Sequence, residues 1–199
     1  MKSSARRVAL APSFEQIEPA FAELRDFVLN DLQRIVSQEV GGNYAAAALI
    51  SSAYEEVARL RKQAKHVPFG DRLPVQWRPV AKSLYGALRN GLVHHYDPKL
   101  IVVDDRRVEL CLSWRERPHL SLEGARLYLN VQRMADDLRR TFDDYEQALR
   151  ADATLRDRFQ STRKDREEQV SDQYEAEAWR GLLGSAGKEG FPAVESRSY

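Results

Sequence analysis

Apolar residues recur every three or four positions along most of this chain, which is the period of one face of an α-helix. The first such stripe runs from Phe14 to Ile35. It follows Ser13 and Gln16, whose spacing fits a capping box. Gly41-Gly42 and a proline-containing stretch at 66–74 interrupt the later stripes. Together these signals predict four helices, at about residues 13–40, 43–66, 75–96 and 121–150.

The period changes to two between Lys99 and Trp114. In residues 107–114 apolar side chains alternate with Arg, Glu, Cys and Ser, which is typical of a strand with one buried face. Residues 99–103 form the expected partner strand, and residues 104–106 form the turn. We therefore predict a mainly α fold, a helical bundle with one inserted β-hairpin at about residues 99–114.

The apolar stripe thins beyond residue 150. Residues 163–169 are nearly all charged, and residues 181–199 are rich in Gly, Ser and charge. These compositions predict a bundle domain over residues 1–150. Residues 151–199 are expected to form a charged helical extension that ends in a mobile tail.

Charge and composition exclude several classes of protein. The chain has 199 residues and a net charge of +1, so it has no global attraction for nucleic acid. Its longest apolar runs are too short for a transmembrane helix, and its single cysteine, Cys111, excludes an internal disulfide and a Cys-rich zinc site. Phosphate-loop, nucleophile-elbow and His-Glu-x-x-His motifs are absent from the sequence. We expect a cytoplasmic protein without a cofactor, a metal or a membrane partner.

The third predicted helix carries a basic stripe opposite its apolar face. The stripe consists of Arg78, Lys82, Tyr85, Arg89 and Tyr96. Cations bind phosphates and tyrosine rings stack on unpaired bases, so the stripe fits an RNA-binding surface. An ordinary solvated helix face has the same charge distribution, and both interpretations stay open.

The segment at residues 89–96, Arg-Asn-Gly-Leu-Val-His-His-Tyr, is more specific. Arg89, the polar Asn90 and His94 match the signature of the HEPN superfamily. Tyr96 completes the Arg-x4-His-x-Tyr form found in HEPN toxins that are encoded beside minimal nucleotidyltransferases. From Phe14 to about residue 150 the chain thus resembles a HEPN helical bundle.

The resemblance implies a metal-independent endoribonuclease, in a toxin or a defence effector. In that family the RNA 2′-hydroxyl is the nucleophile, and cleavage leaves a 2′,3′-cyclic phosphate. Arg89, Asn90 and His94 would be the catalytic residues: imidazole transfers protons near neutral pH, guanidinium stabilises charge on phosphate oxygens, and the amide orients the ring. The remaining stripe residues, Arg78, Lys82, Tyr85 and Tyr96, would bind RNA.

The resemblance also implies partners. Family members dimerise with two motifs facing one cleft, which predicts a homodimer. In the toxin group the matching tyrosine, here Tyr96, accepts AMP from a nucleotidyltransferase antitoxin, and the added bulk and charge block the site. An acidic residue of the second helix, Glu55 or Glu56, would pair with Arg89 as in some family members. A solvated acidic pair is the alternative.

Other interpretations of the same residues remain. Arg89 and His94 lie about 140° apart on an ideal helix, so they converge only through arginine's reach, helix distortion at Gly91 or two subunits. His94 and Tyr96 also fit packing roles at a helix end. A non-catalytic HEPN-type module that binds RNA or protein would use the same stripe. In a purely structural helical protein the motif would be a coincidence.

Overall fold

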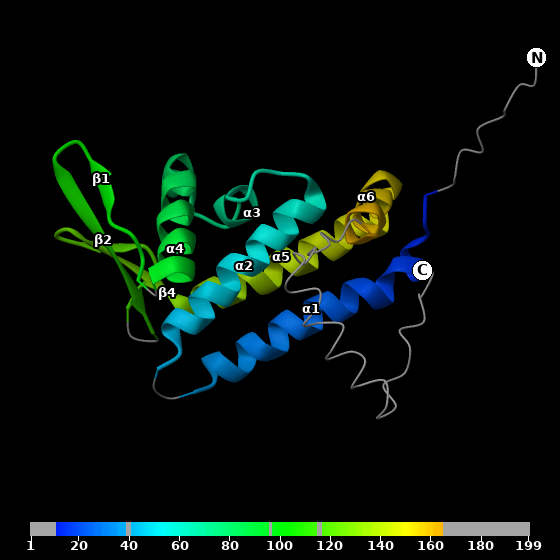
Figure 1. Ribbon diagram of the computed structural model, residues 1–199, viewed down its shortest axis with the longest axis horizontal. Coiled ribbons are helices and arrows are strands. Elements are labelled where there is room, and N and C mark those ends of the chain that lie inside the picture. Colours follow the sequence, from blue (N-terminus) through cyan, green and yellow to red (C-terminus); the bar gives the residue numbers. More distant parts are fainter. Residues whose placement is uncertain (1–10, 39–40, 96, 115–116, 165–199) are drawn as a thin grey trace, which may run out of the picture. The chain divides into compact units, whose positions relative to one another are not determined.

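Three long helices pack side by side and enclose the apolar core: α1 (Phe14–Val36), α2 (Asn43–Arg61) and α5 (Val131–Ala151) (Figure 1). A shorter helix, α6 (Ala153–Lys164), packs against all three. It inserts Phe159 among the rings of Phe21 and Tyr145, with ring centroids 6.2 and 6.5 Å away. Phe159 is 1% exposed, so the compact unit continues to Lys164, past the predicted limit at residue 150.

This computed structural model describes residues 11–38, 41–95, 97–114 and 117–164. The side chains of residues 93–95 and 164 are outside that description. The predicted mobile tail and the charged extension beyond residue 164 lie outside the described residues.

The first two predicted helices are confirmed, with different ends. The Ser13 N–H donates to Gln16 Oε1 at 2.8 Å, as the capping-box spacing predicted, and α1 begins at Phe14. Helix α2 begins at Asn43 after two glycines with φ of 85° and 82°. It ends at Arg61, because the next residue, Lys62, has a left-handed backbone with φ of 53°. The predicted loop that follows contains a single helical turn, α3 (Val67–Gly70).

The third predicted helix is divided in two. Residues Val75–Val80 form a 3-10 helix, η1, and α4 spans Ala81–His95. Pro79 lacks a backbone N–H and its ring crowds the preceding turn, so a continuous α-helix through residue 79 is disfavoured. Arg78 therefore lies on η1, and Lys82 and Arg89 lie on α4.

The predicted hairpin is confirmed and is part of a larger sheet. Strands β1 (Ile101–Val103) and β2 (Arg106–Ser113) pair antiparallel. Two further strands, β3 (Ser121–Glu123) and β4 (Arg126–Asn130), form a second hairpin. Strand β4 pairs with β2 in parallel, which gives the order β1-β2-β4-β3.

The prediction of a helix from residue 121 was wrong over its first ten residues. Leu127 belongs to β4, and α5 begins only at Val131. Asn130 is the N-cap, with its Oδ1 accepting from the Arg133 N–H at 3.0 Å. Leu127, Val131 and Met134 have helical spacing across the junction of strand and helix, which explains the error.

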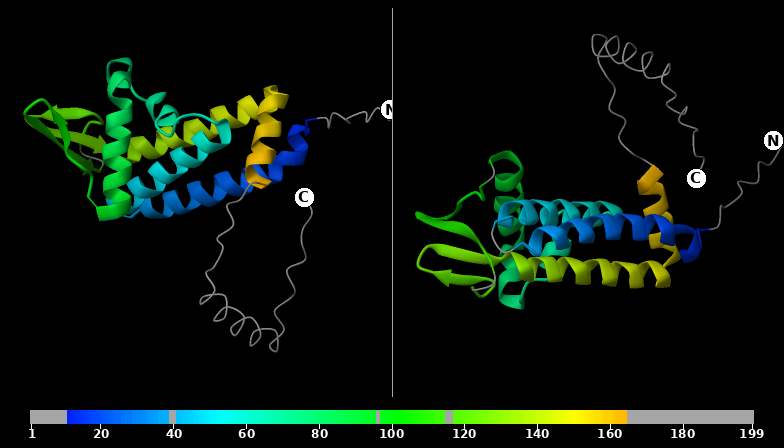
Figure 2. Two further views of the ribbon diagram at one scale, coloured as in Figure 1. Left: turned by 45° about the horizontal axis from the view of Figure 1, so that its top comes forward. Right: turned by 90° about the horizontal axis from the view of Figure 1, so that it is seen from below.

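Helix α4 stands between the sheet and the three long helices (Figure 1). It contacts α2, α3 and β1. Figure 2 shows the sheet at one end of the bundle and α6 at the other. Helix α4, which carries Arg89 and Asn90, is therefore packed where helices and sheet meet.

Candidate functional site

Two hydrogen bonds fix helix α4 against α2. The Tyr85 hydroxyl donates to the Ser51 carbonyl oxygen at 2.9 Å, and Arg89 Nε donates to Glu55 Oε2 at 2.9 Å. Ser51 and Glu55 lie one turn apart on α2, as Tyr85 and Arg89 do on α4. The two helices therefore match turn for turn, and this register sets the position of Arg89.

Tyr85 is a core residue, and its predicted place on an exposed RNA-binding stripe was wrong. It is only 5% exposed. Burial, together with the charge of Glu55, raises the pKa of Tyr85 to about 12. The buried face of α4 is wide because the helix packs against α2, α3 and β1 together, and Tyr85 falls within that face. Its ring is not available for stacking on a base.

Glu55 is shared by two cations from different segments. Besides Arg89 of α4, it binds the Nζ of Lys65, which follows α2. Partial burial acts to raise the pKa of Glu55, but the hydrogen bond from Lys65 and the charge of Arg89 outweigh it and lower the pKa. The carboxylate is therefore ionised near neutral pH, and the three side chains together carry one net positive charge.

Arg89 is anchored with part of its hydrogen-bonding capacity left over. Its side chain is 28% exposed, and its Nη1 makes a long contact of 3.4 Å with Asn90 Oδ1. A guanidinium has five N–H donors. Within the part of the chain that the structure describes, Glu55 and Asn90 are its recorded acceptors. The guanidinium is thus held in place and can still bind a phosphate.

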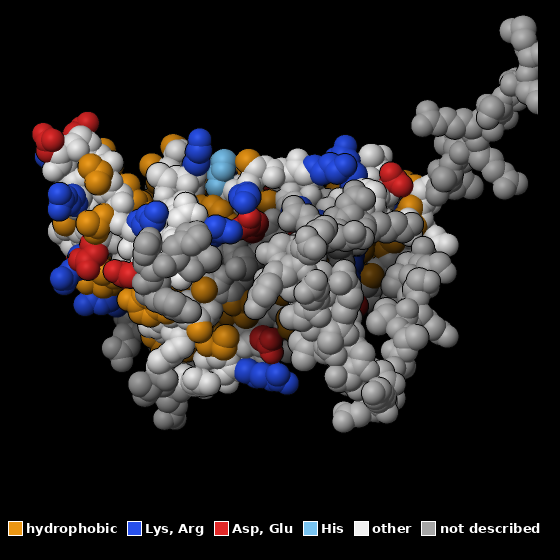
Figure 3. Space-filling view, viewed as in Figure 1, with side chains coloured by type: hydrophobic (Ala, Val, Ile, Leu, Met, Phe, Trp, Pro, Cys, Tyr) orange, Lys and Arg blue, Asp and Glu red, His pale blue; other side chains and the backbone are white. Residues whose placement is uncertain are grey.

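The other predicted site residues with described side chains lie on α4, with Arg89, or on η1. Lys82 is exposed on α4, two turns before Arg89, and Asn90 is exposed beside Arg89. Arg78 is exposed on η1, where its Nε donates to the Leu73 carbonyl oxygen at 3.1 Å. In the space-filling view, Lys and Arg side chains gather over α4 and α3 around a small acidic area (Figure 3).

Two motif residues are only partly placed. His94 belongs to the last turn of α4, but its side chain lies outside the described residues. Tyr96 lies wholly outside them, as do the side-chain contacts of His95. The convergence of Arg89 with the His94 ring therefore stays a prediction. The RNA-binding and AMP-acceptor roles of Tyr96 stay predictions as well.

Gly91 allows the chain to cross over α4. The Lys99 N–H donates to the Ala87 carbonyl oxygen at 3.0 Å, so the segment after the helix folds back along it. A Cβ at residue 91 would lie 2.2 Å from the Asp97 carbonyl oxygen and 2.5 Å from the Lys99 nitrogen. Only glycine leaves room for this segment at residue 91. The crossing places the backbone of Lys99 against α4, the helix that carries Arg89.

Lys65 could not be predicted as part of the site, because it follows the end of α2 and belongs to no periodic stripe. The pairing of Glu55 with Arg89 is as the resemblance implied, and Glu56 instead pairs with Arg59 on its own helix at 2.7 Å.

Two other titratable residues have structural roles. His119 Nδ1 accepts the Asn130 N–H at 3.1 Å, and burial lowers its pKa to about 4. Cys111 lies half-buried on β2, where burial and then the charge of Glu109 raise its pKa. A neutral histidine and a protonated thiol are poorly suited to proton transfer or nucleophilic attack near pH 7.

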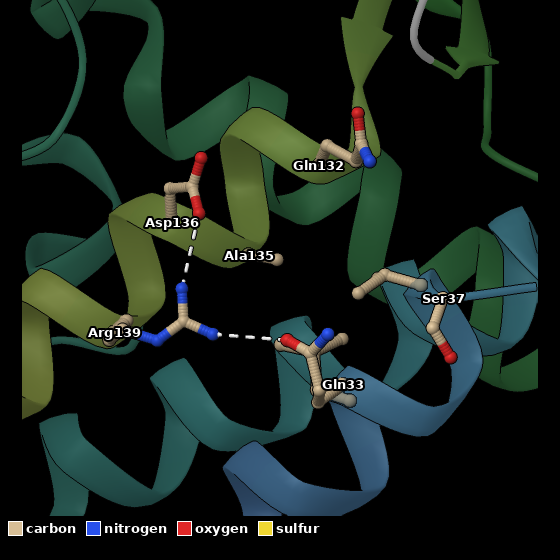
Figure 4. Close-up of a pocket in the computed structure, with 8 residues that line it drawn as sticks. Gln33, Ser37, Gln132, Ala135, Asp136 and Arg139 are labelled. Atoms are coloured by element: carbon tan, nitrogen blue, oxygen red, sulfur yellow. Dashed lines mark hydrogen bonds and ion pairs between the residues drawn. The ribbon is translucent and has the colours of Figure 1, made fainter.

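A separate hollow lies between the end of α1 and the start of α5 (Figure 4). Arg139 spans it, with Nη1 3.2 Å from Asp136 and Nη2 3.4 Å from Gln33. The residues that line the hollow belong to neither α2 nor α4.

Within the described residues, no three His, Cys, Asp or Glu side chains gather closely enough to hold a metal ion. Among the described helices, none has the length and apolar content needed to cross a bilayer.

Comparisons with protein-family models, with curated proteins and with solved structures found no match to this chain.

Proposed function

We propose that this chain is a HEPN-type endoribonuclease that cleaves RNA without a metal ion. One observation carries the proposal: Arg89, the first residue of the Arg-x4-His-x-Tyr motif, is held by Glu55 of a second helix and, among the described residues, has N–H donors left for an anion. A merely solvated arginine would not need an interhelical anchor, because water satisfies its donors.

The residue types suit attack by the RNA 2′-hydroxyl. His94 would exchange protons with the attacking or the leaving oxygen, since imidazole titrates near neutral pH. Arg89 would stabilise the negative charge that develops on the phosphate oxygens. Asn90, exposed beside Arg89, would orient the histidine or the phosphate. Arg78 and Lys82, both exposed and both N-terminal to Arg89, would bind the RNA backbone.

The first test is RNA cleavage in the presence of a chelator. Wild type should cleave and leave 2′,3′-cyclic phosphate ends. His94→Ala and Arg89→Ala should each lose about 100-fold or more in rate while keeping the fold, since a proton-transfer group and an oxyanion-stabilising group each contribute that much. Arg107→Ala, exposed on β2, is a control away from the motif and should cleave normally.

The outcome also separates cleavage from binding alone. If pure, folded wild type binds RNA but leaves it intact, the non-catalytic module takes the place of the nuclease. In either case Lys82→Ala and Arg78→Ala should weaken RNA binding and reduce its salt dependence by about one counterion each. If neither variant changes affinity, these two residues do not contact RNA.

A toxin or defence role, with a nucleotidyltransferase antitoxin as partner, is part of the same proposal. Intact-mass measurement after co-expression with such an enzyme should show addition of AMP to wild type and none to Tyr96→Phe. Inhibition without an adduct would remove Tyr96 from the acceptor role and leave the cleavage site untouched.

A further inference from the structure

Strand β1 has an open edge with the properties of a pairing surface. It is the end strand of the sheet within the part of the chain that the structure describes. Val102 is 64% exposed and Val103 56% exposed, and the strand consists only of Ile101, Val102 and Val103. Edge strands are commonly protected by lysine, proline or a bulge within the strand, and β1 has none of these.

The register of the hairpin shows which backbone groups are unpaired. Val103 lies opposite Arg106, and the two residues between them form the turn, with Asp104 at a φ of 51°. In a hairpin closed by two residues, the pair next to the turn exchanges both hydrogen bonds, and the next pair does not. The N–H and C=O of Val102 therefore point away from β2, toward the open edge.

We propose that β1 pairs antiparallel with β1 of a second copy of this chain, around a two-fold axis at Val102. A continuous sheet requires opposite residues to point to the same face, so a register can place Val102 opposite Val102 but not opposite Ile101. With Val102 at the axis, the two valines exchange two backbone hydrogen bonds, and Ile101 lies opposite Val103 of the second copy. This register is also the one that pairs all three residues of each β1.

Charge favours the same register. Lys99 precedes β1 and the exposed Asp104 and Asp105 follow it. Antiparallel pairing about Val102 brings Lys99 of each copy beside the acidic turn of the other, twice in the dimer. A strand with a cation at one end and two anions at the other is complementary to its own antiparallel copy.

An apolar surface adjoins the open edge. Leu100 is 51% exposed, and Val103, on the same face of β1 as the core-packed Ile101, is 56% exposed. Pairing would cover both side chains. This surface is the sheet edge and not the α4 face that carries the motif, so the inference does not depend on RNA cleavage.

Sedimentation velocity of the full chain over a range of concentrations tests the proposal. Wild type should show a reversible monomer–dimer equilibrium. Val102→Lys should weaken association about tenfold or more, because it places like charges opposite each other at the axis. Val102→Thr is the matched control: it keeps the β-branched strand residue and should still dimerise. Circular dichroism and thermal unfolding establish that both variants are folded.

Charge reversal and cross-linking test the register. Lys99→Glu, and Asp104→Lys with Asp105→Lys, should each weaken the dimer, and the combined variant should restore it. In a Cys111→Ser background, Val102→Cys should form an intermolecular disulfide, because Cα atoms about 5.5 Å apart in a hydrogen-bonded pair suit one. Leu122→Cys, 58% exposed on the other edge strand, should not.

Three outcomes would overturn the proposal. Wild type that sediments as a monomer up to its solubility limit has no such interface. A dimer that is unaffected by Val102→Lys uses another surface. A monomer that instead adds an extended peptide at β1, detected by loss of binding in Val102→Lys, would assign the edge to a different partner.

Discussion

Glu55 and Asp137 are two carboxylates that both pair with arginines. They differ in whether the arginine belongs to another helix or to the same helix. Glu55 pairs with Arg89 across two helices, whereas Asp137 pairs with Arg133 and Arg140 on its own helix, α5. The Asp137 side chain is 9% exposed and the Glu55 side chain 24%. The first pair therefore fixes one helix relative to another, and the second covers a buried charge.

Their pKa values move in opposite directions. Burial raises the pKa of Asp137, even though Arg133 and Arg140 act against the rise. For Glu55 the cations outweigh the burial and the pKa falls. The comparison teaches that an arginine beside a carboxylate is not by itself a sign of a functional site. What distinguishes Glu55 is that its arginine partner belongs to the motif and is held from a second helix.

The largest expected effect comes from Gly91→Ala, on α4, the helix that carries the Arg89 partner of Glu55. The added methyl would overlap the backbone of Asp97 and Lys99, so we expect a loss of about 3 kcal/mol in the free energy of unfolding, together with loss of RNA cleavage. Urea unfolding measures the first effect. Gly86→Ala is the matched control on the same helix: a Cβ there meets nothing within 4 Å, and the variant should be about 0.5–1 kcal/mol more stable. Equal stability of the two variants would contradict the close crossing.

A smaller effect should separate the two carboxylates by activity. Glu55→Ala removes the anchor of Arg89, and we expect the kcat for RNA cleavage to fall about 10- to 100-fold, well beyond what its small loss of stability would explain. Asp137→Asn should leave kcat unchanged, because its arginine partners do not belong to the motif. A fall in kcat that follows the melting temperature in both variants would mean that Glu55 acts only through stability.

The smallest effect is in the pH dependence of stability. The folded-state pKa of Glu55 lies below its unfolded value, so its contribution is present above about pH 4.3 and is lost as the pH falls through the folded pKa. The stability deficit of Glu55→Gln should therefore be largest near neutral pH and shrink in acid. Asp137 has the opposite sign: its raised pKa lowers stability as the pH rises through that value. Relative to wild type, Asp137→Asn should thus gain stability from acid to neutral pH. Parallel trends in the two variants would contradict the opposite shifts.

Hydrophobic periodicity was sufficient to predict a helix or strand where a single element buries one face. The spacing of Phe14, Phe21 and Val28 predicted α1, and the alternation from Val108 to Leu112 predicted β2. Periodicity failed where helical spacing continued across two elements. Leu127 of β4 and Val131 of α5 have such a spacing. The missed signals were Gly124, which has a φ of 59°, and the alternation of Leu127 with Leu129 in β4.

The candidate site could be predicted only in part. Arg89 and Asn90 follow from the motif, because it is local in sequence. The burial of Tyr85 could not be predicted from a helical wheel, since the wheel does not show that α4 packs against α2, α3 and β1. The contact of Lys65 with Glu55 depends on how the chain turns after Lys62. Lys62 has a left-handed backbone, which no sequence pattern predicted.

The single cysteine of the chain lies on β2, between Glu109 and Ser113. Its raised pKa means that little thiolate is present in the folded sheet at neutral pH, so alkylation there should be slow. Once the strand separates from β4, the thiol returns to an ordinary pKa and reacts faster. Cys111 is therefore an intrinsic probe whose labelling should accelerate when the sheet opens, without any change to the sequence.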